Sequence, residues 1–192
     1  MRMRKVMAAA LTGLALIGLA GTASAQGSED LTWPPKDVTP VHKTKAELQE
    51  QAAEFTARQE RTFPRIFRGA ENVVHGQWGG ESAGSISDGQ QYLTSWTTLT
   101  YRGQATEVFT QVNAPGFFQT SPQELCERDK CTGRVSDHRG GLTVFTERPE
   151  YGITVAWNFR PNGEVVWAQS WAKDTKAQVA AVASDRAYTF TR

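Results

Sequence analysis

The segment ITVAWNFRPNGEVVWAQSWA, residues Ile153–Ala172, decides the fold because it predicts a β-hairpin on its own. Large and small side chains alternate along both arms, and a turn sequence lies between them. Proline presets the backbone of a type I turn, and glycine takes the left-handed position that follows it. A three-residue loop, Pro161–Gly163, therefore pairs Arg160 with Glu164 and fixes the register of the two strands.

The predicted register gives the hairpin two unlike faces. One face pairs Phe159 with Val165, Trp157 with Trp167, Val155 with Gln169 and Ile153 with Trp171. The opposite face carries small, moderately polar residues: Thr154, Ala156, Asn158, Val166, Ala168, Ser170 and Ala172. Because large rings bury the most apolar area, we expect the aromatic face to form the core beneath the helices.

The rest of the chain after Glu71 follows the same two-residue period, in short runs rich in threonine, valine and aromatic residues. This pattern is typical of antiparallel sheet. The predicted strands are 71–78, 90–102, 104–113, 133–138, 142–148, 153–160 and 164–172, with a tight turn at Arg102-Gly103. The alternating residues Tyr188–Arg192 predict a further edge strand.

Capping boxes predict the helices. Thr44-Lys45-Ala46-Glu47 begins a helix of residues 44–61, which Pro64 is expected to stop. Ser121-Pro122-Gln123-Glu124 begins a short helix that ends near Cys126–Arg128, and Thr175-Lys176-Ala177-Gln178 begins a helix of residues 175–185.

These elements predict an α+β fold. A curved antiparallel meander of six to seven strands is covered on one face by the 44–61 helix and by the short 175–185 helix. A β-sandwich with peripheral helices is the alternative. Residues 26–43 form a proline-rich extended tail before a single domain at 44–192, and Trp33 in that tail is expected to dock back onto the domain.

The first 25 residues predict a cleavable signal peptide. Arg2, Arg4 and Lys5 precede the apolar run Val6–Ala20, which is too short to span a bilayer. Ala23-Ser24-Ala25 is the small-residue pattern that signal peptidase cleaves. We therefore expect a secreted, extracellular protein that has no membrane attachment after cleavage behind Ala25.

The charge balance argues against nucleic-acid binding. Removing Arg2, Arg4 and Lys5 with the signal peptide leaves 18 basic residues against 20 acidic ones. A nearly neutral chain lacks the excess of positive charge that binds phosphate backbones or anionic membranes.

Cys126 and Cys131 are the only cysteines, and in an exported chain they predict a disulfide. Closing so short a loop stabilises the fold by about 2 kcal/mol. Asp129 and His138 lie nearby, but their spacing matches no zinc pattern, so neither a metal nor another cofactor is expected.

The segment GESAG, Gly80–Gly84, matches the G-x-S-x-G motif of α/β-hydrolase carboxylesterases. A serine hydrolase would use Ser82 with His138 and an acid, Asp137 or Asp129. The motif lacks the buried strand before it, the helix after it and the parallel sheet that this fold requires. The enzyme is therefore the less favoured alternative.

Tyr92 and Trp96 share one face of a predicted strand with a stripe of threonines, Thr94, Thr98 and Thr100. Such a surface is expected to stay exposed and to stack a sugar ring or a partner's side chain. The favoured function is thus a non-enzymatic binding domain for an extracellular protein or carbohydrate. Its size and single disulfide also leave an exported hydrolase inhibitor as an alternative.

The C-terminal part of the chain combines a cysteine, a Gly-Gly turn, a strand, an R-P-[ND]-G hairpin and a closing helix, here Cys131, Gly140-Gly141, Leu142–Arg148, Arg160–Gly163 and Thr175–Asp185. In these features it resembles uncharacterised secreted proteins of actinobacteria. The resemblance implies localisation and topology but no activity.

Overall fold

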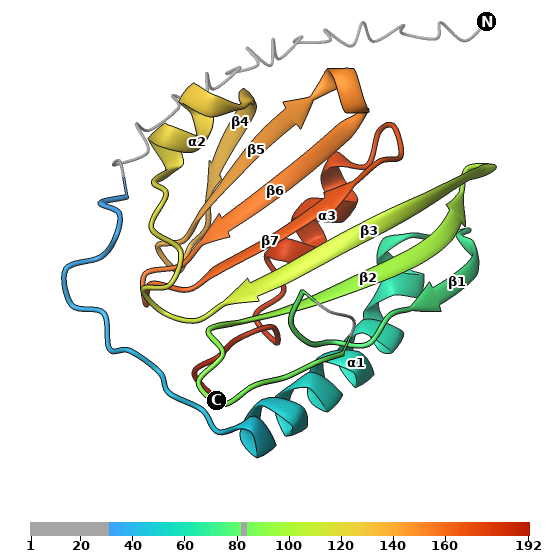
Figure 1. Cartoon of the computed structure of the whole chain (residues 1–192). Helices are drawn as coiled ribbons and strands as arrows, with labels where there is room; N and C mark the ends of the chain where they lie inside the picture. The colour runs from blue at the N-terminus through green and yellow to red at the C-terminus, as the bar shows by residue number, and fades with distance from the viewer. Residues whose placement is uncertain (1–30, 82–83) are drawn as a thin grey trace, which may run out of the picture.

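The computed structural model describes residues 31–81 and 84–192; the predicted signal peptide and Ser82 lie outside these ranges. The predicted α+β fold is confirmed, since three α-helices flank one antiparallel sheet of order β1-β2-β3-β7-β6-β5-β4 (Figure 1). The strands are β1 (Glu71–His75), β2 (Tyr92–Tyr101), β3 (Gln104–Asn113), β4 (Lys130–Ser136), β5 (Leu142–Arg148), β6 (Ile153–Phe159) and β7 (Val165–Ser170). The helices are α1 (Lys45–Ile66), α2 (Pro122–Arg128) and α3 (Lys176–Ala183). Within the described ranges, no helix has the length and apolar character needed to cross a membrane.

Helix α1 begins at the predicted capping box, where the Thr44 side chain accepts from the Glu47 amide and the Glu47 carboxylate accepts from the Thr44 amide. The predicted stop at residue 61 is wrong, because the helix continues through Pro64 to Ile66. Proline removes one backbone donor from the last turn. Phe63 and Phe67, each 1% exposed, pack into the core on either side of it and hold the turn in place.

Helix α3 covers the small-residue face of the β6–β7 hairpin, so the expectation that α1 and α3 cover the aromatic face is wrong. The aromatic face forms a second core, in which Leu125 of α2 packs with Trp157 and Phe159. Val179 and Val182 share the main core with Ala156 and Ala168 of the sheet, all nearly or fully buried. Alanines let a helix approach the sheet closely, whereas tryptophans would hold it away. The predicted capping bond at Thr175 is absent; its hydroxyl donates to the Ala172 carbonyl at 2.9 Å.

The predicted hairpin register is confirmed along the ladder, from Phe159 opposite Val165 to Thr154 opposite Ser170. The expected pair of Ile153 with Trp171 falls just beyond the end of β7. Other strand boundaries differ from the prediction by no more than about three residues, as is usual for ends assigned from sequence.

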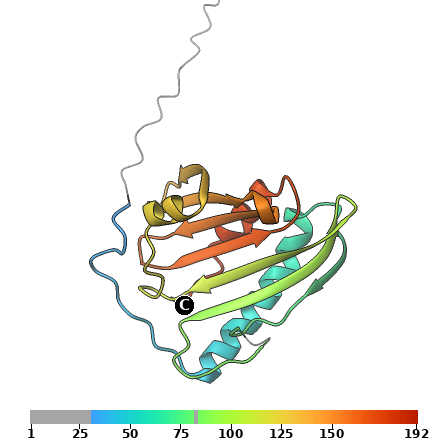
Figure 2. The ribbon, with the colours of Figure 1, turned by 45° about the horizontal axis from the view of Figure 1, so that its top comes forward.

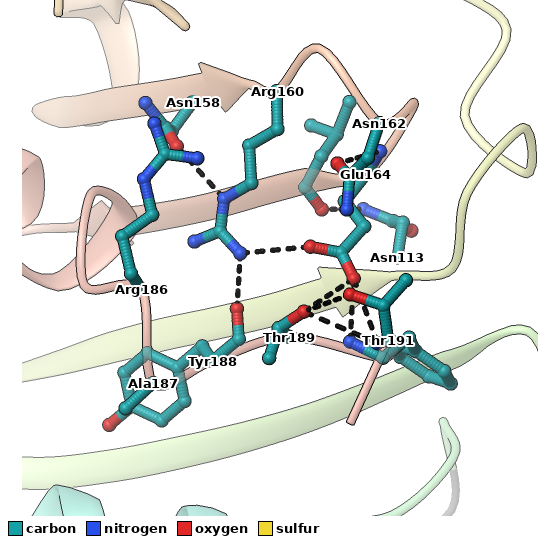
Figure 3. A network of polar contacts seen from close by, with 12 residues as sticks. Asn113, Asn158, Arg160, Asn162, Glu164, Arg186, Ala187, Tyr188, Thr189 and Thr191 are labelled. Carbon is teal, nitrogen blue, oxygen red and sulfur yellow. Dashed lines mark hydrogen bonds and ion pairs between the residues drawn. The ribbon is translucent and has the colours of Figure 1, made fainter. Parts of the chain in front are cut away.

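The last residues, Tyr188–Arg192, do not form the predicted strand. The Glu164 carboxylate instead accepts from the Phe190 and Thr191 amides at 2.8 and 3.1 Å and from the Thr189 hydroxyl (Figure 3). A side-chain oxygen thus satisfies backbone donors that a neighbouring strand would otherwise take.

Arg160 makes further contacts with the C-terminal segment. We call Arg160, Glu164 and the residues that they bind at Tyr188–Thr191 the C-terminal clasp. Arg160 pairs with Glu164 at 3.1 Å and donates to the Tyr188 carbonyl (Figure 3). It also donates to the backbone carbonyls of Ala183 and Asp185, at and just after the end of α3. Arg160 and Glu164 are 2% and 1% exposed. Burial lowers the pKa of Arg160, and the Glu164 carboxylate opposes that shift.

The predicted disulfide is confirmed: Cys126 and Cys131 are bonded, with a Cα–Cα distance of 5.0 Å, and join α2 to β4. The segment before α1 runs beside the sheet from the region of α2 to the start of α1 (Figure 2). Trp33 docks as expected, with its ring 4.8 Å from that of Phe159 and its indole donating to the Phe118 carbonyl.

Candidate functional site

Large aromatic side chains gather on the sheet face that α1 and α3 leave open. The registers place Trp96 opposite Phe109 and Trp157 opposite Trp167, so β2, β3, β7 and β6 each contribute one of four neighbouring rings on the same face. Trp171 follows β7 and stacks on Trp96. These five residues, Trp96, Phe109, Trp157, Trp167 and Trp171, are called the aromatic row.

The rings of the aromatic row are in continuous contact. The centroid distance is 5.5 Å between Trp96 and Trp171, and 4.7 Å for each of the pairs Trp96–Phe109, Phe109–Trp167 and Trp157–Trp167. Offset and edge contacts of this kind stabilise aromatic pairs beyond the area that they bury. Each ring therefore limits the motion of the next, and the row is ordered before any ligand arrives.

Exposure increases along the row. Trp157 is 6% exposed, because Phe118 covers it and its indole donates to the Thr146 hydroxyl at 3.0 Å. Trp167 and Trp171 are half-buried, and Trp96 is 43% exposed. The expectation of an exposed Trp96 agrees with the structure. The expectation that Trp157 is a core residue also agrees, whereas Trp167 and Trp171 are only partly buried on the same face.

Tyr92 shares the open face with Trp96 but lies four residues away on β2, roughly 13 Å along the strand. Its ring stacks on Phe117 at 5.5 Å, and Phe117 is 44% exposed. The two predicted binding residues thus belong to two separate aromatic groups on one surface.

A hollow of about 380 Å³ lies beyond Trp96 in the direction away from Tyr92, toward the turn that joins β2 to β3. Thr98, Thr100 and Glu107 line it from the open face, and Asn72 lines it from β1. A β-bulge in β1 contains Asn72 in the left-handed region, with φ 52°, and its amide donates to the Thr100 hydroxyl at 3.3 Å. Bulges commonly redirect a side chain in this way. We call this site the polar hollow.

The open face of the four inner strands carries almost no charge. Among the residues of β2, β3, β6 and β7 that point to this side, Glu107 is the one ionised group, and the polar side chains beside the row are amides and hydroxyls such as Gln111, Gln169 and Thr98. A surface without lysine or arginine gives no attraction to phosphate or carboxylate groups. The site therefore favours an uncharged ligand.

Asp137 and His138, the acid and base of the hydrolase alternative, lie in the turn between β4 and β5. One Asp137 oxygen accepts from the Arg139 and Gly141 amides at 2.8 and 2.9 Å, and the other pairs with Arg186. Burial raises the pKa of Asp137, but the two amides and Arg186 outweigh it and hold that pKa below its usual value. The carboxylate thus stabilises its own turn.

The glycines beside Ser82 lie far from that turn. Gly79 bridges to Thr94 on the outer side of β2, and β3, β7 and β6 separate β2 from β5. Each interval between strands is about 4.8 Å. The structure therefore does not bring Asp137 and His138 to the flanks of the motif, and Ser82 itself lies outside the described residues.

Within residues 31–81 and 84–192, no group of three or more histidine, cysteine, aspartate or glutamate side chains is arranged to hold a metal ion. His75 on β1 contacts the Thr97 hydroxyl at 3.2 Å and the edge of the Phe63 ring. Burial lowers the pKa of His75.

Sequence reasoning missed Phe109, Glu107 and Asn72. The first two had a usable signal: a two-residue turn at Arg102-Gly103 pairs Tyr101 with Gln104 and therefore sets Phe109 opposite Trp96 and Glu107 opposite Thr98. Asn72 had none, because a bulge changes the register without a mark in the sequence.

No known protein family matches the chain, and neither a curated protein nor a solved structure is similar to it.

Proposed function

We propose that this chain is an exported, non-enzymatic protein that binds an uncharged extracellular carbohydrate on the aromatic row. The observation that carries the proposal is Trp96, which is 43% exposed although it stands in a row of mutually packed rings. A large ring left in water but held in one orientation is a rigid anchor that loses little conformational freedom on binding.

The chemistry of the row supports a sugar over other neutral ligands. The C–H groups on one face of a pyranose are weakly positive and stack on the negative face of an indole. Gln111 and Gln169 lie beside the rings and offer amides to hydroxyl groups. A peptide strand would need a free sheet edge, whereas the row crosses inner strands whose backbones are already paired.

The test is a binding screen of the secreted protein with matched variants. Neutral polysaccharides and oligosaccharides are immobilised beside unrelated peptides, and bound protein is quantified. We expect a carbohydrate to retain the wild type and the Phe117→Ala variant but not Trp96→Ala. Phe117 is the matched control because it is an equally exposed ring, 44%, outside the row. Retention by peptides alone, or equal loss in both variants, would contradict the proposal.

The same preparation separates this function from the alternatives. Its N-terminal sequence is expected to begin at Gln26, as cleavage after Ala25 requires. A fluorophosphonate probe is expected to form no adduct that depends on Ser82. A strong adduct that disappears in Ser82→Ala would support the serine hydrolase instead.

A further inference from the structure

Three groups outside the aromatic row were candidates for a further role. The cleft at the C-terminal clasp is lined by Arg160 and Glu164, whose charged atoms are already satisfied within the chain. The groove between α1 and His75 is lined in part by Gly84, which directly follows residues 82–83 outside the described ranges, so its full lining is not defined. The polar hollow differs from both, because its polar groups are open to solvent and lie next to the most exposed ring of the row.

We propose that the polar hollow is a subsite for a single pyranose unit and that Glu107 determines which sugar it accepts. This inference rests on the proposed function. A sugar bound on the row continues past Trp96, so that the unit at this end of the ligand lies over Thr98 and Glu107. Its ring stacks beside Trp96, while its hydroxyls donate to the Glu107 carboxylate.

The size of the hollow suits one sugar unit. A volume of about 380 Å³ lies near the lower end of the range for small-ligand sites. Thr98 follows Trp96 on the open face of β2, two residues further along the strand. Glu107 of β3 is paired directly with Thr98. Trp96 and Glu107 are therefore diagonal neighbours on the two strands, about 7–8 Å apart, a distance that one pyranose unit with its hydroxyls can bridge.

The hydrogen-bonding groups of the hollow complement adjacent hydroxyls. An ionised carboxylate has two acceptor oxygens, and hydrogen bonds to a charged acceptor are roughly twice as strong as neutral ones. Within residues 31–81 and 84–192, no basic side chain forms an ion pair with Glu107, and the nearby Arg102 pairs with Asp174 at 3.8 Å. Its oxygens thus remain available to a ligand.

Asn72 and Thr100 supply the opposite wall. The Asn72 amide donates to the Thr100 hydroxyl, so the amide carbonyl of Asn72 is oriented by that bond and can accept from the sugar. The bulge places this residue in the left-handed region, which asparagine tolerates better than other side chains except glycine. A sugar unit would thus meet acceptors from two strands.

Isothermal titration calorimetry with neutral hexasaccharides tests the subsite. Wild type and Glu107→Gln are titrated with cello-, malto-, xylo- and N-acetylchitohexaose, with the per-O-methylated form of whichever binds, and with cationic chitosan oligosaccharides for comparison. We expect Glu107→Gln to bind the recognised hexasaccharide at least tenfold more weakly than the wild type, with an unchanged melting temperature. The per-O-methylated sugar, which has no hydroxyl to donate, is expected to bind both proteins equally.

Glu50→Gln is the matched control, since Glu50 is an exposed carboxylate on α1, on the other side of the sheet. It is expected to bind like the wild type. Full affinity of Glu107→Gln together with loss in Trp96→Ala would overturn the subsite and leave the proposed function standing. Failure of every hexasaccharide to bind the wild type would overturn both. Binding restricted to cationic chitosan oligosaccharides would show an ion pair at Glu107 and would overturn the hydroxyl recognition.

Discussion

The two faces of the β6–β7 hairpin carry side chains of opposite size, and α3 packs on the face with the smaller ones, whereas the shorter helix α2 packs beside the rings. Ala156 and Ala168 lie beneath α3, whereas Trp157 and Trp167 lie on the open side one residue away. The alanine face buries less area per residue but admits a helix at close range. Side-chain size, rather than hydrophobicity alone, therefore decides where α3 packs, and Trp96, Trp167 and Trp171 on the opposite face stay partly exposed.

The largest effect expected on the helix-covered side comes from the C-terminal clasp. Glu164→Gln leaves Arg160 buried without its partner charge, so we expect the free energy of unfolding to fall by about 3–5 kcal/mol. Urea titration followed by circular dichroism measures this. Glu147→Gln is the control, because its exposed pair with Lys130 at 3.9 Å contributes about 1 kcal/mol or less. Equal losses in the two variants would show that the clasp does not stabilise the fold.

A pair of leucine substitutions compares the two faces at neighbouring positions. Ala168→Leu inserts three carbon atoms beneath α3 and is expected to destabilise the protein by about 1–3 kcal/mol. Gln169→Leu lies one residue further on the open face and is expected to change stability by about 0.5 kcal/mol or less. Thermal unfolding measures both. A larger loss for Gln169→Leu would reverse the assignment of the faces.

A smaller effect is expected at His75, near the edge of the helix-covered side. Burial lowers its pKa in the folded state, so the unfolded chain binds the proton first as the pH falls. Stability is therefore complete above about pH 7 and decreases as the pH falls through the unfolded value near 6.5. Urea titrations at pH 7.5 and 5.5 should show a smaller decrease in His75→Gln than in the wild type. An identical decrease would mean that His75 does not contribute.

Local chemistry made part of this structure predictable. The turn at Pro161–Gly163 fixed the register of β6 and β7, and the capping boxes at Thr44 and Ser121 marked where α1 and α2 begin. Each signal depends on residues a few positions apart, so no tertiary information was needed.

The remaining features depend on residues far apart in the chain. Glu164 binds amides about 26 residues away, and Gln59 of α1 is buried between the Thr97 hydroxyl and the Trp78 indole at 2.8 and 3.0 Å. No sequence period marks such contacts. The face that α3 covers was predicted wrongly. The prediction considered the apolar area that each ring buries but not the short distance at which a helix packs on a sheet.

The central proposal is that the exposed Trp96 end of the aromatic row serves ligand binding rather than folding, and Trp96→Ala tests it most directly. Carbohydrate affinity and the free energy of unfolding are measured on one preparation of this variant and of the wild type. We predict at least a tenfold loss of affinity with a change in stability of about 1 kcal/mol or less, since Trp96 is 43% exposed. A stability loss of about 3–5 kcal/mol, as for a tryptophan removed from a core, or an unchanged affinity would contradict the account.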